Sequence, residues 1–177
     1  SKELAFSHDL QLDLCSVLDW TKTWQLSVNL NKCNVLKLGF QGRDLNHSYV
    51  LDDSNIENVN SCSDLGIVMS SNLNFSEHCG KLVSAASRKV GLTYRVFSSR
   101  SKKFMIDMLK GQIRPVLESN TEIWSPLNKQ DIDRIENVQR SFTKRINGLW
   151  NLSYRERQNF CEIETLEMRR LKRDLVL

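Results

Sequence analysis

Apolar side chains recur at helical spacing near the beginning of the chain. Leu10, Leu14, Val17 and Leu18 share one face if residues 7–24 form a helix. The opposite positions are mostly polar or charged, as in an amphipathic helix. This segment is therefore predicted to be a helix whose apolar stripe packs into a core.

The apolar period changes to two after this helix. Apolar residues alternate over 26–30 and again over 36–40, which predicts a hairpin that turns at residues 31–34. A second turn is expected at residues 52–55, where Asp, Ser and Asn side chains can bond to the local backbone. Residues 65–69 are predicted to be one more short strand, whose glycine allows a bulge or a close backbone approach.

The period returns to helical in the second half of the chain. Helices are predicted over residues 76–97, 104–112 and 129–146. Pro115 disfavours helical geometry at the residue before it, so a kink or a restart is expected there. Ser153 and Thr165 fit the first positions of two further helices, the former in a capping box with Glu156. The whole pattern predicts an α+β chain: a leading helix plus short antiparallel strands, followed by a helical part, with the seam near residues 70–76.

Charge is distributed unevenly along the chain. The net charge is +4, made of −3 over residues 1–88 and +7 over residues 89–177. The densest basic stretch contains eight cations and only Asp107 against them: Arg88, Lys89, Arg95, Arg100, Lys102, Lys103, Lys110 and Arg114. Such a stretch can follow a polyanion, because each neutralised phosphate releases counterions. It can equally be a solvated helix face that keeps the protein soluble.

Composition excludes several classes of protein. No apolar run approaches the roughly 20 residues of a membrane-spanning helix. The five cysteines are irregularly spaced and odd in number, so free thiols are expected and a disulfide framework is not. No leader for secretion is evident, and an intracellular location, nuclear or cytoplasmic, is expected.

Few residues have the spacing of a catalytic or metal-binding motif. Asp52-Asp53 is the one pair of adjacent carboxylates, and its surroundings favour a turn over a two-metal site. His78-Cys79 lacks the second ligand pair of a structural zinc site. A phosphate-binding P-loop and a Gly-x-Ser-x-Gly elbow are both absent from the sequence. The sequence therefore predicts no metal site in this chain.

A series of short strings stands in a specific order along the chain. They are Leu18–Trp20, Trp24–Asn29, Asn31–Cys33, Val35–Gly39, Ser63–Ile67, Phe75–Cys79, Phe97–Ser101, Arg114–Glu118, Trp124–Pro126, Val138–Lys144 and Leu152–Arg157. In this order and spacing the chain resembles, over roughly residues 8–175, the reverse transcriptases of non-LTR (LINE-like) retrotransposons of the jockey and chicken-repeat type.

The resemblance implies a division of the chain and a set of partners. Residues 1–73 correspond to the end of a polymerase palm with a primer-grip-like hairpin, residues 74–126 to a thumb-like helical region, and residues 127–177 to a C-terminal helical region. In the family, an aromatic-Ala-Asp-Asp strand before this part helps to hold two Mg²⁺ ions. Mg²⁺ is thus implied for the full-length parent and no cofactor for this chain, which is expected not to polymerise alone. The implied partners are RNA template, DNA primer and the upstream fingers and palm, with no membrane.

Site residues follow from the same resemblance. Lys32 resembles the palm lysine that is proposed to protonate the leaving pyrophosphate, although it can also be a surface lysine of a turn. Leu65, Gly66 and Ile67 resemble the primer grip. The expected contacts to template–primer are the cations of the helix and of the basic stretch that follows it: Arg88, Lys89, Arg95, Arg100, Lys102, Lys103 and Arg114.

The sequence leaves three functional interpretations open. The first is a fragment of an RNA-directed DNA polymerase that grips the template–primer duplex. The second is a non-catalytic nucleic-acid- or protein-binding module retained from a retroelement. The third is a decayed copy. Residues 169–173 form a weak candidate for a nuclear localisation signal, and the charged side of a terminal helix explains them as well.

Overall fold

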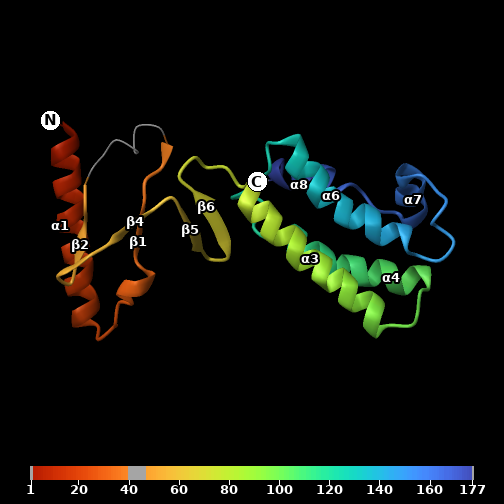
Figure 1. Ribbon diagram of the computed structural model, residues 1–177, viewed down its shortest axis with the longest axis horizontal. Helices are drawn as coiled ribbons and strands as arrows, with labels where there is room; N and C mark the ends of the chain where they lie inside the picture. Colours follow the sequence, from red (N-terminus) through yellow and green to blue (C-terminus); the bar gives the residue numbers. More distant parts are fainter. Residues whose placement is uncertain (1, 40–46, 177) are drawn as a thin grey trace. The chain divides into compact units, whose positions relative to one another are not determined.

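The structure is a computed structural model that describes residues 2–39 and 47–176, with side chains from residue 8 onward (Figure 1). The chain divides into two compact units, Ser1–Asn74 and Phe75–Leu177. The first combines a helix with short strands and the second is helical, so the chain is α+β, as predicted.

The described residues of the first unit form one long helix and three small sheets. Its elements are α1 (Lys2–Thr23), the 3-10 helix η1 (Leu30–Lys32), β1 (Asn34–Leu36), β2 (Val50–Leu51), β3 (Ser54–Asn55), β4 (Glu57–Val59), β5 (Ser61–Asp64) and β6 (Ile67–Ser70). β2–β3 and β5–β6 are antiparallel, as predicted, whereas β1 pairs with β4 in parallel, so the prediction of antiparallel strands is wrong for this pair.

The predicted hairpin around residues 31–34 is wrong. Residues 30–32 form η1, and β1 pairs with β4 in the register Val35 with Asn58. The local alternation is real, but the partner strand lies more than twenty residues away, where a local pattern cannot find it. Phe40 of the predicted second strand lies outside the described residues.

The two later turns form antiparallel hairpins. The turn predicted at residues 52–55 is confirmed for Asp52 and Asp53, which join β2 to β3 with φ of +51° and +59°. Ser54 and Asn55, predicted as part of the turn, form β3. Leu65 and Gly66 join β5 to β6 with φ of +48° and +83°. The predicted strand therefore begins at Ile67, and Gly66 serves a two-residue turn in place of a bulge.

Helix α1 does not bury the predicted apolar stripe within the described structure. Leu10 and Val17 are exposed, and Leu14 and Leu18 are half-buried. Polar contacts join α1 to the strands: the Gln11 side-chain amide bonds to both the N–H and the C=O of Val50, at 2.9 and 2.8 Å. The predicted packing of this stripe into a core is therefore wrong for the described residues, since the small two-stranded sheets leave two of its four side chains exposed.

The second unit is built from helices. They are α3 (Ser76–Val96), α4 (Lys102–Met108), the π-helix η2 (Leu109–Ile113), α5 (Arg114–Leu117), α6 (Lys129–Lys144), α7 (Tyr154–Cys161) and α8 (Leu166–Asp174). α3 packs on α6, where the rings of Tyr94 and Phe142 lie 5.4 Å apart. The fully buried core includes Met105, Leu109, Ile113, Leu117, Trp124, Ile135, Phe142 and Leu166.

The predicted helix ends are found with one modification. Ser153 caps α7 in the predicted capping box with Glu156, and the Thr165 side chain accepts a hydrogen bond from the Met168 N–H at the start of α8. The restart predicted near Pro115 is a π turn followed by α5. Arg114 keeps helical angles, contrary to the geometry predicted for the residue before a proline. Pro115 lies in the first turn of α5, where its missing N–H is tolerated.

Among the residues that the structure describes, no helix has the length and apolar character of a membrane span.

Candidate nucleic-acid interface

Two arginines project from the outer face of α3. Arg88 and Arg95 lie opposite Ala86, Val90 and Thr93, the positions that α3 buries. They are seven residues apart, so their Cα atoms are separated by about 10 Å along the helix axis. Both are exposed, and no hydrogen bond or ion pair to either is found within the described part of the chain. This face therefore offers two cations to solvent.

Two further predicted cations, Lys89 of α3 and Arg100 just after it, contact backbone carbonyl groups. The Lys89 ammonium lies 3.3 Å from the carbonyl oxygen of Gln112. The Arg100 guanidinium donates to the carbonyls of Tyr94, at 2.6 Å, and Phe97, and stands 4.8 Å from the Tyr94 ring centroid. A cation at the last carbonyls of a helix is stabilised by the helix dipole. Arg100 therefore stabilises the C-terminal end of α3, and its side chain is half-exposed.

Lys102 and Lys103 stand in the first turn of α4 and are exposed. The Lys102 ammonium lies 4.0 Å from the centre of the Phe160 ring, in a cation–π contact. Both lysines line a small pocket of about 350 Å³ together with Lys110 and Glu162. These lysines are available to an anionic partner.

Arg114 differs from the other predicted cations because it is 5% exposed. Its Nε donates to Oε1 of Gln139 at 3.0 Å, and its Nη2 donates to the carbonyl of Glu164 at 3.3 Å. Burial, followed by the charge of Arg169, lowers the pKa of its guanidinium. Arg114 therefore joins α5 to α6 and to the start of α8, and it does not belong to the outer basic surface.

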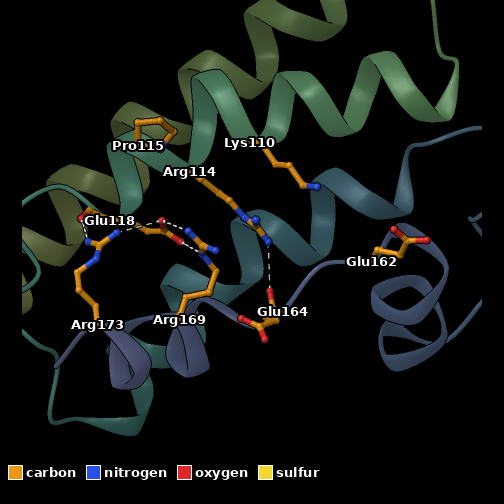
Figure 2. Close-up of a pocket in the computed structure, with 8 residues that line it drawn as sticks. All are labelled: Lys110, Arg114, Pro115, Glu118, Glu162, Glu164, Arg169 and Arg173. Carbon is orange, nitrogen blue, oxygen red and sulfur yellow. Dashed lines mark hydrogen bonds and ion pairs between the residues drawn. The ribbon is translucent and has the colours of Figure 1, made fainter. Parts of the chain in front are cut away.

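A larger pocket of about 720 Å³ lies beside Arg114 (Figure 2). Besides Pro115, its lining consists of seven charged residues: Lys110, Arg114, Glu118, Glu162, Glu164, Arg169 and Arg173. Sequence reasoning included Lys110 in the basic stretch but did not identify this pocket. A usable signal was present, because Arg169 and Arg173 are four residues apart and so share a face of the helix that follows Thr165.

The remaining predicted residues belong to the first unit. Lys32 is exposed at the end of η1. Leu65 is 87% exposed at the tip of the β5–β6 hairpin, with Gly66 beside it, and Ile67 is buried. The predicted residues thus form two sets, a hairpin tip with Lys32 in one unit and a basic surface in the other.

The described residues contain no group of three or more His, Cys, Asp or Glu side chains that could hold a metal ion. The Asp52 carboxylate instead forms an ion pair with Lys22, with Nζ and Oδ1 3.1 Å apart. The described residues therefore do not fit the Mg²⁺ ions implied for the parent.

Comparison with known proteins finds a similar sequence in Drosophila melanogaster, the probable RNA-directed DNA polymerase from transposon X-element. The two are 25% identical over 133 residues, which make up 73% of this chain but only 14% of the relative. No family model and no solved structure match the chain. The similarity supports a reverse-transcriptase-related origin for the chain.

Proposed function

We propose that this chain is part of a non-LTR retrotransposon reverse transcriptase and that its helical unit grips the RNA–DNA template–primer duplex. The observation that carries the proposal is the outer face of α3, where Arg88 and Arg95 project without a partner among the described residues. The similarity to a transposon polymerase supplies the context for that surface.

Electrostatics explains how this surface would grip a duplex. Arg88 and Arg95 lie about two helical turns apart on a helix that the core holds rigid, so both can contact one duplex. Each contact with a phosphate releases condensed counterions, which favours binding without regard to base sequence. Lys89, Lys102 and Lys103 add positive charge nearby along the chain. Binding that is independent of base sequence suits a polymerase, because the sequence of the bound duplex changes as the enzyme moves along its template.

The first unit has a separate proposed role. The tip at Leu65 and Gly66 would approach the primer end, as in the primer grip that it resembles. Lys32 would stand near the leaving pyrophosphate once the upstream palm is present. The carboxylates and Mg²⁺ of polymerisation would come from the parent polypeptide, so this chain alone would not extend a primer. Its work would take place inside the cell, in nucleus or cytoplasm, on RNA template and DNA primer.

Charge reversal on α3 tests the proposal. Binding of a fluorescent RNA–DNA hybrid is measured by anisotropy over a series of salt concentrations for the unaltered chain and for the double variant Arg88→Glu, Arg95→Glu. If both arginines contact phosphates, the log–log salt slope should lose about 0.9 per contact, or roughly 1.8 in total.

The matched control is the double variant Lys144→Glu, Arg155→Glu. It makes the same change in net charge at exposed positions of α6 and α7. A slope that falls equally in both variants, or in neither, would contradict the proposal. The alternative, a non-catalytic module retained from a retroelement, would remain if the chain bound single strands or protein and ignored the hybrid.

A further inference from the structure

The pocket beside Arg114 has an excess of unpaired positive charge. Glu118 is 7% exposed and accepts two hydrogen bonds from Arg169, at 2.6 and 3.0 Å, and it also pairs with Arg173 at 3.6 Å. Glu164 pairs with Lys172 outside the pocket. These carboxylates are therefore already neutralised by cations other than Arg114 and Lys110.

Arg114 is a buried cation with only neutral acceptors. Its two hydrogen bonds go to the side-chain amide of Gln139 and to the backbone carbonyl of Glu164. No carboxylate of the described chain lies within ion-pair distance of it. Glu118 and Glu136 attract this guanidinium only from beyond ion-pair distance. Removing a charge from water without a direct ion pair is costly, and an anion in the adjoining pocket would offset that cost.

Lys110 adds a second cation to the same space. Figure 2 shows Lys110 and Arg114 extending from one helical segment toward the segment that carries Glu162 and Glu164. Lys110 is exposed and has no hydrogen bond or ion pair to any residue that the structure describes. The pocket thus combines a fixed guanidinium, which suits planar two-point contact with oxygens, with a mobile ammonium.

We propose that this pocket binds a phosphate group, held by Lys110 and Arg114. A phosphate has the negative charge that would offset the excess of cations in the pocket and the oxygen geometry that an arginine fork prefers. Glu162, at the rim, opposes the binding and limits its strength. The phosphate has two possible sources, the backbone of a bound nucleic acid or a free phosphate compound. The site is separate from the outer face of α3 and does not depend on a grip there.

The first experiment uses inorganic pyrophosphate with the whole 177-residue chain at constant ionic strength. Binding is followed by NMR chemical shifts of the amides around Arg114. Lys110→Gln should weaken binding about tenfold, the loss expected for one charge-assisted contact. Glu162→Gln should strengthen it by about threefold or more, because it removes a rim carboxylate. Lys144→Gln removes a lysine of α6 outside the pocket and should change nothing.

The second experiment separates the two sources. If the ligand is a backbone phosphate, Lys110→Gln should weaken hybrid binding and lower its salt slope by about one, and pyrophosphate should compete with the hybrid. If it is a free phosphate compound, Lys110→Gln should weaken pyrophosphate binding by the same tenfold and leave hybrid affinity unchanged. The proposal is overturned if neither probe responds to Lys110→Gln, or if Lys144→Gln has the same effect. Loss of hybrid binding by the α3 variants alone would leave this site untouched, so the two proposals fail separately.

Discussion

Glu118 and Arg169 form a two-point ion pair that joins α5 to α8. Nε of Arg169 lies 2.6 Å from Oε1 of Glu118, and Nη2 lies 3.0 Å from Oε2. The carboxylate is buried, whereas the guanidinium is about one-third exposed. This pair and the neighbouring Arg173 connect α8, the last helix, to the end of the short helix α5.

Glu118→Ala should destabilise the helical unit by about 2 kcal/mol, because it removes the buried carboxylate that Arg169 and Arg173 share, while Arg173 keeps its ion pair with Glu122. Lys172→Ala is the control. Lys172 lies on α8, like Arg169, and forms an exposed ion pair with Glu164. Loss of this pair should cost under about 1 kcal/mol. Urea denaturation followed by circular dichroism measures both. Equal losses would show that the Glu118 pair contributes no more than a surface pair.

Ser153→Ala should lower the free energy of unfolding by about 1 kcal/mol through loss of the α7 cap. The Ser153 hydroxyl accepts from the Glu156 N–H at 3.3 Å, and the Glu156 carboxylate accepts from the Ser153 N–H at 2.7 Å. Ser153→Asp keeps a side-chain acceptor at the cap and should retain most of the stability. If both substitutions destabilise α7 equally in thermal unfolding, the capping hydrogen bond is not the cause.

Stability should fall as the pH rises above about 9, in part because of Cys79. Burial, with a smaller contribution from Asp131, raises the pKa of the Cys79 thiol to about 11. Between pH of about 9 and 11 the folded chain keeps the thiol proton that the unfolded chain has lost. Each pH unit in this range therefore lowers the free energy of unfolding by up to about 1.4 kcal/mol. Urea denaturation at several pH values should show a shallower decline for Cys79→Ala. Cys15→Ala, which removes an exposed thiol, is the control, and an equal decline in both variants would exclude Cys79 as the cause.

The helices were predictable because their signals are local. Residues 129–146 carry a regular apolar period, and Ser153 and Thr165 are caps whose hydrogen bonds lie within three residues. Strand pairing was not predictable to the same extent. β1 pairs with β4 across an intervening hairpin, so its alternation indicated a strand but suggested the wrong partner.

The candidate nucleic-acid interface was also predictable only where its signal is local. Exposure of Arg88 and Arg95 follows from their place opposite the apolar stripe of α3, which the sequence displays. Burial of Arg114 depends on Gln139 and Glu164, which come 25 and 50 residues later. The local charge pattern does not distinguish these three arginines. Their exposure to solvent depends on tertiary contacts, which the pattern does not contain.

The hairpin tip offers a test that separates stability from binding. Leu65 has φ of +48°, which is unfavourable for leucine, and 87% of it is exposed. Two-residue turns of this kind favour Asn followed by Gly, so Leu65→Asn should stabilise the β5–β6 hairpin by several tenths of a kcal/mol, up to about 1. Gly66→Ala should destabilise it by about 1 kcal/mol through backbone strain alone, since a Cβ there meets no atom within 4 Å.

Amide hydrogen exchange of residues 61–70 measures hairpin stability, and anisotropy measures hybrid binding. If Leu65 touches the primer end, Leu65→Asn should slow exchange while it weakens hybrid binding, because a stable hairpin then lacks its apolar tip. If the tip has no contact with nucleic acid, exchange slows and hybrid binding stays the same. The second result would remove the hairpin from the proposed grip and leave the outer face of α3 as its remaining basis.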